Sequence, residues 1–327
     1  DRGVPMKPRF RATVTATLAG GLVVLLAACT TGTYTATPTS IPPVVTPTTT
    51  ATSSTAIPDC GNPLQTYDPL PSLTSQAANN AVAEIRSRDY LIAGVSADSW
   101  LLGSRNPLTG KIEGFDIDLV HAVAQAIFGD PNKVQLVVIS AAQRKTVLVE
   151  KKVDIVVRNM TMNCDRWASF AFSSQYYQSG LKILVRKGDP TTSLVGLAGK
   201  KVCAPTATSS LAAVIATPGV VPVTAANHTG CLVLFQNGEV DAIAGDDTVL
   251  AGLAAQDPYA FVPKMDPLTS EPYGIGIQKD KIDFVRYVNR VVDTYKADGR
   301  WQASYNQWFL TNLNVEATPP ASTYGRT

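Results

Sequence analysis

Three residues able to bind a polar small molecule follow one apolar, strand-like run of the sequence. Asn159, Thr161 and Arg166 come just after Asp154–Val157. Ligands of open α/β sheets bind at the carboxyl ends of strands, so we expect these side chains at a binding edge. The planar guanidinium of Arg166 can hold a carboxylate through two parallel charge-assisted hydrogen bonds. An ordinary surface arginine is the alternative interpretation of this residue.

A second polar group follows two later strand-like runs. Thr208 and Ser209 lie between a strand and a helix, and Asp246 comes after Asp241–Ala244. Hydroxyl groups at a helix N-terminus form a suitable anion site. Capping of the helix is the alternative role for Ser209 or Ser210.

An enzyme needs a poised acid or base, and the sequence offers little evidence of one. Glu113 and Glu271 are candidates by position only, since neither has an evident partner. The sequence shows no nucleophile–base pair and no phosphate loop. It lacks a Cys-x-x-Cys motif and has only two histidines, which argues against a metal site. We therefore expect that the protein binds neither a cofactor nor a metal and that it is not an enzyme.

The elements that must position these residues alternate between strands and helices, which predicts an α/β fold with mostly parallel sheets. Phe115, Leu119, Val120, Val123 and Ile127 recur at helical spacing. The predicted strands are Leu91–Val95, Val134–Ile139, Asp154–Val157, Lys201–Ala204 and Asp241–Ala244, and the predicted helices are Val82–Arg88, Asp116–Phe128, Gln143–Glu150, Ser209–Ile215, Gly230–Asn237, Thr248–Ala255 and the long Phe284–Trp308.

The same alternation occurs twice, which predicts two lobes with a ligand cleft between them. Two strands resemble crossovers between the lobes, Lys182–Val185 and Tyr273–Ile277. The first lobe would then comprise residues 59–181 and 278–314, and the second 182–277. Residues 315–327 are expected to form a loose tail.

The N-terminus has the features of an export signal. Lys7, Arg9 and Arg11 precede an apolar stretch, Val14–Ala28, that ends in small residues. The sequence Leu-Ala-Ala-Cys ending at Cys29 resembles a bacterial lipobox, which predicts lipidation of Cys29 after removal of residues 1–28. An ordinary secreted protein is the alternative, and Met6 is the expected start of translation.

Residues 29–58 are dominated by Thr, Pro, Ser, Ala and Val, a composition typical of an extended tether. The whole chain of 327 residues has a formal net charge of +2, and four of its bases lie within residues 1–28. The remainder is nearly neutral, so charge gives no argument for nucleic-acid binding.

Four further cysteines, in an exported chain, suggest disulfides, and four cysteines allow three pairings. Cys203 and Cys231 fall in the same predicted lobe, which favours a Cys203–Cys231 bond and leaves Cys60 with Cys164.

Short motifs across Val82–Leu310 resemble the polar amino-acid-binding family of bacterial ABC-importer solute-binding proteins, most of all an actinobacterial lipoprotein branch that binds glutamate, aspartate or glutamine. The matching stretches are Gly114–Leu119, Val153–Thr161, Phe172–Tyr177, Gly199–Val202, Gly238–Ala242, Asp246–Thr248 and Glu271–Gly276.

The resemblance implies the two-lobe periplasmic-binding-protein-like type II fold and an extracytoplasmic, membrane-anchored monomer. Such a protein captures a small amino acid, here glutamate or aspartate before glutamine or asparagine, and delivers it to the permease of an ABC importer. One alternative is a subunit that reports amino-acid availability to a membrane receptor. Another is an enzyme on the same scaffold, a dehydratase or a peptidoglycan lyase.

The resemblance also assigns the main ligand contacts. Arg166 corresponds to the family's carboxylate-binding arginine, Asp246 to its ammonium acceptor, and Asn159 and Thr161 to ligand-contacting positions. Helix capping is the alternative for Asp246, although Asp247 suits that role better. Residues 206–210, the hydroxyl loop, have Ala207 where the family has glycine, and this departure bears on the path of the loop.

The remaining candidates concern the ligand's side chain. Arg144 corresponds to an arginine that binds the side-chain carboxylate in acidic amino-acid binders, with a solvated helix face as the alternative. Arg158 is a possible second cation. Ser96 replaces a charged residue of the family, and Trp100 would form an aromatic wall over the ligand unless it is a core residue.

Overall fold

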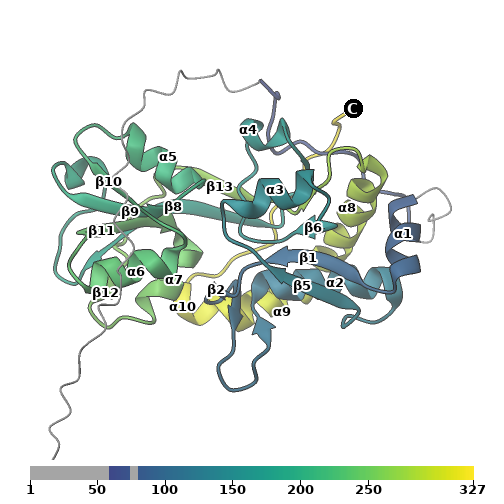
Figure 1. Ribbon diagram of the computed structural model, residues 1–327, viewed down its shortest axis with the longest axis horizontal. Helices are drawn as coiled ribbons and strands as arrows, with labels where there is room; N and C mark the ends of the chain where they lie inside the picture. The colour runs from purple at the N-terminus through teal and green to yellow at the C-terminus, as the bar shows by residue number, and fades with distance from the viewer. Residues whose placement is uncertain (1–58, 74–79) are drawn as a thin grey trace, which may run out of the picture. The chain divides into compact units, whose positions relative to one another are not determined.

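The computed structural model describes residues 59–73 and 80–327 (Figure 1). The predicted signal, Cys29 and the predicted tether lie outside these residues. Among the described residues, no helix is long and apolar enough to cross a membrane.

The first lobe is built on a five-stranded sheet in the order β5-β1-β6-β14-β7. Its strands are β1 (Leu91–Val95), β5 (Val134–Val138), β6 (Ile155–Val156), β7 (Ala171–Phe172) and β14 (Gly276–Ile277), and its helices include α1 (Asn80–Arg88), α2 (Phe115–Phe128), α3 (Gln143–Val149), α4 (Cys164–Trp167), α8 (Ile282–Ala297), α9 (Arg300–Tyr305) and α10 (Thr311–Leu313). β1 runs parallel to β5 and β6, whereas β14 is antiparallel to β6 and β7. A small sheet of β2 (Asp98–Ser99), β3 (Gly103–Arg105) and β4 (Ile112–Glu113) follows β1 in the chain.

The second lobe is built on a six-stranded sheet in the order β10-β9-β11-β8-β12, with β13 also paired to β8. Its strands are β8 (Tyr177–Arg186), β9 (Lys201–Pro205), β10 (Val221–Ala225), β11 (Ala242–Asp246), β12 (Ala260–Phe261) and β13 (Ser270–Tyr273), and its helices include α5 (Ser209–Ala216), α6 (His228–Gln236) and α7 (Asp247–Ala254). Separate apolar clusters, one containing Val214 and one containing Phe235, pack around this sheet.

The chain passes between the two sheets twice, but not at the residues that the sequence suggested for the first passage. Lys182 and Leu184 already pair with β11, well inside the second sheet. The first passage therefore lies between β7 and β8. The return passage lies between β13 and β14, within the predicted stretch Tyr273–Ile277.

The prediction of one long C-terminal helix is wrong, because the helix is interrupted after Ala297. Gly299 adopts the left-handed conformation, with φ of 87°, and α9 begins at Arg300. Glycine takes up this conformation without the penalty that a Cβ atom brings.

The C-terminal residues are also not loose, contrary to expectation. Ser322 and Tyr324 donate hydrogen bonds to the carboxylate of Asp293 on α8, at 2.8 and 2.6 Å. Thr323 forms a parallel bridge with Gln65. Polar pairing rather than apolar burial holds this segment, so its composition gave no sign of its order.

Between the described cysteines there are two disulfides, Cys60–Cys164 and Cys203–Cys231, in the pairing favoured from the sequence. The second bond joins β9 to α6 in the interior of the second lobe, where both cysteines are fully buried.

Candidate functional site

The candidate residues gather at the carboxyl ends of strands from both sheets. Polar contacts connect the two lobes there: Arg144 Nη2 donates to the carbonyl of Ala207 at 3.2 Å, and the hydroxyls of Thr161 and Ser209 lie 3.3 Å apart. The second lobe therefore supplies groups to the same place as the first, as a ligand held between lobes requires.

Arg166 is a cation without an anionic partner in the described part of the chain. It lies in the one-turn helix α4, and its Nη1 donates to the carbonyl of Thr161 at 2.6 Å. The ion pairs between described residues do not include it. Burial lowers the pKa of Arg166, and the charges of Asp246 and Glu271 oppose that shift. A half-buried guanidinium with free donors favours an anionic ligand group.

Asp246 is the complementary anion. It ends β11 and is 4% exposed, and its carboxylate accepts a hydrogen bond from Tyr273 Oη at 2.6 Å. Burial, reinforced by the charge of Glu271, raises the pKa of Asp246 to about 7. Although Asp246 precedes α7, its side chain makes no capping bond. Asp247 accepts instead from Thr248 N and from Ser179 Oγ.

Glu271 was not predicted as a ligand-site residue. It lies on β13 and is 3% exposed, and its Oε2 accepts hydrogen bonds from Thr161 Oγ1 at 2.6 Å and Ser209 Oγ at 2.7 Å. One donor belongs to each lobe, so this carboxylate bridges them. Its Oε1 accepts from Thr269 Oγ1. The site therefore contains a second buried anion. Its negative charge can balance one of the arginines, so not every arginine of the site needs a carboxylate from the ligand.

Arg144 is buried, which excludes the alternative of a solvated helix face. Its guanidinium donates only to carbonyl oxygens among the described residues: Ala141, Arg158, Asn159 and Ala207. Burial lowers its pKa, and the neighbouring charges of Arg166 and Arg158 act in the same direction. Neutral acceptors leave the charge uncompensated, which is costly in a dry site.

Asn159 has an unusual backbone and an unused side-chain oxygen. Its φ of 35° lies in the left-handed region, and its N–H donates to Asp116 Oδ2 at 2.8 Å. Its Oδ1 is buried without a hydrogen-bond partner in the described structure. A buried, unsatisfied acceptor is rare and is consistent with a ligand donor at this place.

Arg158 and Ser96 form a network of their own. Arg158 Nε donates to the carbonyl of Ile139, and its Nη2 lies 3.7 Å from Asp98 Oδ1. Ser96 Oγ donates to the same carboxylate at 2.7 Å. Arg158 thus has an anionic partner, unlike Arg144 and Arg166. The side chain of Trp100 is 39% exposed, which excludes a core role.

The hydroxyl loop differs in detail from expectation. Thr208, not Ser209 or Ser210, caps α5, because its Oγ1 accepts from Leu211 N at 3.1 Å and donates to the carbonyl of Pro205. Ser209 is left to bind Glu271. Ala207 adopts φ of 58°, the conformation that a glycine would favour.

Replacing Ala207 by glycine should therefore stabilise the protein. Relief of left-handed strain outweighs the added chain entropy, and we expect a gain of up to about 1 kcal/mol, or about 2–4 °C in Tm. Thermal unfolding followed by circular dichroism measures this. Ala213→Gly, inside helix α5, is the matched control and should lower Tm. A lower Tm for both variants would contradict the strain argument.

Ligand affinity should depend on pH through Asp246. Its carboxyl group is protonated below about pH 7, whereas pairing with a ligand ammonium requires the ionised form. Affinity should therefore fall as the pH drops from 8 to 6, approaching roughly tenfold per unit below the pKa, with proton release on binding. Calorimetry in buffers of different ionisation enthalpy measures both effects. In Asp246→Asn the weaker affinity that remains, measured at high ligand concentration, should no longer depend on pH between 8 and 6, and a remaining dependence would assign it to another group.

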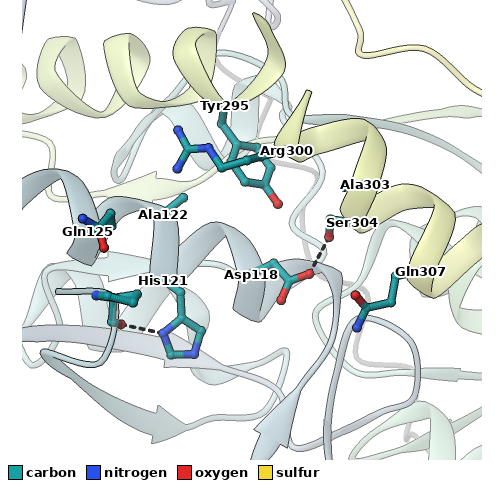
Figure 2. A pocket seen from close by; sticks show the side chains of 10 residues that line it. Asp118, His121, Ala122, Gln125, Tyr295, Arg300, Ala303, Ser304 and Gln307 are labelled. Atoms are coloured by element: carbon teal, nitrogen blue, oxygen red, sulfur yellow. Dashed lines mark hydrogen bonds between the residues drawn. The ribbon is translucent and has the colours of Figure 1, made fainter. Parts of the chain in front are cut away.

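A hollow of about 420 Å³ elsewhere on the first lobe holds none of the candidate residues (Figure 2). Its acidic side chain and its histidine are already paired: Asp118 accepts from Ser304 Oγ at 2.6 Å, and His121 Nδ1 lies 2.6 Å from the carbonyl of Pro131. This hollow therefore gives no argument for a ligand.

Comparison with known proteins decides the family. Residues 91–311 match the family of bacterial extracellular solute-binding proteins, family 3. The chain belongs to this family. The ABC transporter glutamine-binding protein GlnH of Bacillus subtilis is 31% identical over 238 residues, which cover 72% of this chain and 86% of that protein. The glutamate-binding protein GluB of Corynebacterium efficiens is 29% identical, with coverage of 74% and 85%.

The fold is shared with solved structures of solute receptors. The receptor for L-cysteine of Neisseria gonorrhoeae matches with a TM-score of 0.68 and 26% identity, covering 72% of this chain and 96% of that chain. The predicted family and the type II periplasmic-binding-protein fold are thus confirmed. The family consists of extracellular solute-binding proteins, which also confirms that this chain is a receptor rather than an enzyme.

Proposed function

We propose that this protein captures an L-amino acid of the glutamate, aspartate, glutamine and asparagine group and delivers it, as a monomer, to the permease of an ABC importer. One observation carries the proposal. Arg166, which is half-buried, and Asp246, which is buried, carry charges of opposite sign, they come from different lobes, and neither has an ionic partner in the described structure. A zwitterion supplies a carboxylate to the first and an ammonium to the second.

The polar character of the remaining contacts supports this ligand group. The free Oδ1 of Asn159 offers an acceptor, and Arg144 and the hydroxyls of Thr161 and Ser209, which donate to protein oxygens, are further polar groups of the site. An apolar amino-acid side chain would leave this acceptor of Asn159 without a donor, which lowers affinity. The names of GlnH and GluB, which specify glutamine and glutamate, agree with this choice.

Calorimetric titration with each of the twenty amino acids tests the proposal. At least one of the four named amino acids should bind with a Kd of about 1 µM or lower, equivalent to about −8 kcal/mol. Leucine and phenylalanine serve as controls and should give no measurable heat. Preference for an apolar amino acid, or no binding by any of the twenty, would contradict the proposal.

We also propose that Cys29 carries a lipid that holds the protein on the extracytoplasmic face of the membrane. Its place after Leu-Ala-Ala supports this, and acyl chains on one cysteine anchor a protein by burying their methylene groups. In the full chain, Cys29→Ala should release the protein into the medium or leave it unprocessed. Mass spectrometry of the mature N-terminus should find an acylated cysteine, and an unmodified one would refute the anchor.

A further inference from the structure

The helix that carries Arg166 is too short to hold its own position. α4 spans Cys164–Trp167, four residues, and Asn163 caps it by accepting a hydrogen bond from Arg166 N at 3.0 Å. A single helical turn is unstable on its own, because nucleation fixes several residues for one hydrogen bond. Tertiary contacts must therefore hold this turn in place.

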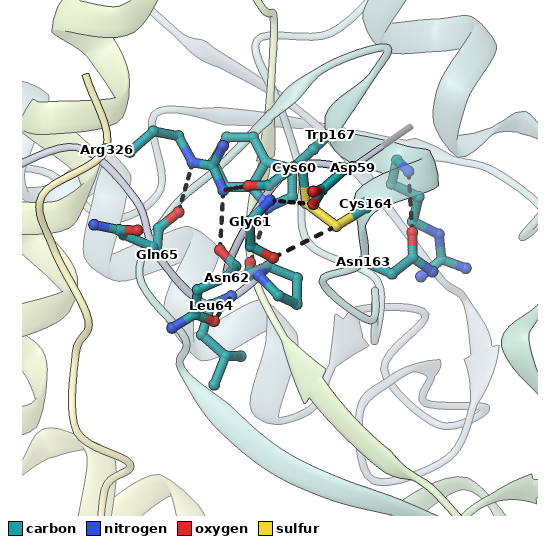
Figure 3. The surroundings of a disulfide bond; sticks show 12 residues. Asp59, Cys60, Gly61, Asn62, Leu64, Gln65, Asn163, Cys164, Trp167 and Arg326 are labelled. Atoms are coloured by element: carbon teal, nitrogen blue, oxygen red, sulfur yellow. Dashed lines mark hydrogen bonds between the residues drawn. A yellow bond between two sulfur atoms is a disulfide. The ribbon is translucent and has the colours of Figure 1, made fainter. Parts of the chain in front are cut away.

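The beginning of the described chain supplies one set of these contacts (Figure 3). The Cys60–Cys164 disulfide attaches the first residue of α4 to a position 104 residues earlier. Trp167, the last residue of α4, donates from Nε1 to the carbonyl of Pro63 at 2.9 Å. The residues on both sides of Arg166 are thus fastened to the same segment.

The end of the chain supplies the other set. The guanidinium of Arg326 lies 3.9 Å from the centre of the Trp167 ring. It also donates to the carbonyls of Gln65 at 2.7 Å and Asn62 at 3.0 Å. Arg326 therefore joins α4 to the N-terminal segment.

We propose that these contacts form a terminal clasp, consisting of the Cys60–Cys164 bond, Pro63, Trp167 and Arg326, which positions Arg166 for the ligand's α-carboxylate. A guanidinium fork gains its two-bond geometry only if its backbone is fixed in advance, and preorganisation of this kind raises affinity. The inference rests on the proposed function, because it assumes that Arg166 binds the ligand.

Two changes in the full chain open the clasp independently. The double variant Cys60→Ser with Cys164→Ser removes the disulfide. Arg326→Ala removes the C-terminal contact, and it provides the test if the double variant fails to fold. Cys203→Ser with Cys231→Ser is the matched control, since this bond lies in the second lobe's interior. Calorimetry measures Kd for the amino acid that the native protein binds best, and competition measures it for the α-carboxamide of that amino acid.

Opening the clasp should weaken binding of the amino acid at least tenfold and binding of its α-carboxamide less than threefold, because only the former uses the full fork of Arg166. The control should change neither Kd more than threefold. In an Arg166→Ala background, opening the clasp should have no further effect. Unchanged affinity in folded clasp variants, or equal weakening for both compounds, would overturn the clasp.

The native protein and Arg166→Ala separate this failure from failure of the proposed function. If they bind the amino acid equally, or if the native protein binds none, the assigned role of Arg166 is wrong and the clasp proposal falls with it. If binding depends on Arg166 but not on the clasp, only the clasp is refuted.

Discussion

Asp246→Ala should weaken the binding of every amino acid by at least about thirtyfold. The carboxylate of Asp246 is buried, and its neighbour Tyr273 offers only a neutral hydroxyl. A ligand ammonium placed there without its anion loses about 2–5 kcal/mol, the range for removing one partner of a buried charge pair. That loss corresponds to roughly thirtyfold to several thousandfold in Kd. Calorimetry at pH 8 measures it, because the carboxyl group of the native protein is then ionised.

The neighbouring aspartate provides the matched control. Asp247 accepts hydrogen bonds from Thr248 N and Ser179 Oγ, so its role lies within the second lobe. Asp247→Ala should keep the affinity within a few-fold and lower the free energy of unfolding by about 1 kcal/mol. If Asp247→Ala weakened binding to this extent and Asp246→Ala did not, the assignment of roles within this pair would be reversed.

The alternating elements could be predicted from sequence because each one carries its own apolar pattern. Leu91–Val95, for example, is an apolar run, and the structure buries it in the first sheet. The first passage between the lobes could not be located in this way. β8 is ten residues long and buried along most of its length, so nothing in its pattern marks where one sheet ends and the next begins.

The site was predictable where its residues follow recognisable strands, as Asn159 and Asp246 do. Glu271 was not, because its meaning depends on hydroxyls that lie 110 and 62 residues away in the sequence, on Thr161 and Ser209. The sequence feature that could have indicated Glu271 is a carboxylate directly followed by the uncharged stretch Pro-Tyr-Gly-Ile-Gly. Arg326 was missed for the same reason, since its partner Gln65 is 261 residues distant.

Arg144→Ala should separate the two kinds of ligand within the proposed group. If Arg144 binds a side-chain carboxylate, glutamate and aspartate lose a buried charge partner, which costs about 2–5 kcal/mol. Glutamine and asparagine lose less, because their amides form weaker hydrogen bonds. The variant also lacks the hydrogen bond from Arg144 to Ala207 that joins the lobes, which weakens the binding of all four ligands. We therefore expect a loss of about a hundredfold or more for the acids and of about tenfold for the amides, measured by calorimetry.

The neighbouring Lys145, exposed on the same helix, is the charge-matched control, and Lys145→Ala should leave all four affinities unchanged.

The charge of Glu271 decides how the result for Arg144→Ala is interpreted. If the buried Glu271 carboxylate already balances one arginine of the site, the remaining charges match a neutral zwitterion, and the acids have no advantage. Equal loss for acids and amides on Arg144→Ala would then assign Arg144 to holding the lobes together and would remove the argument for an acidic ligand.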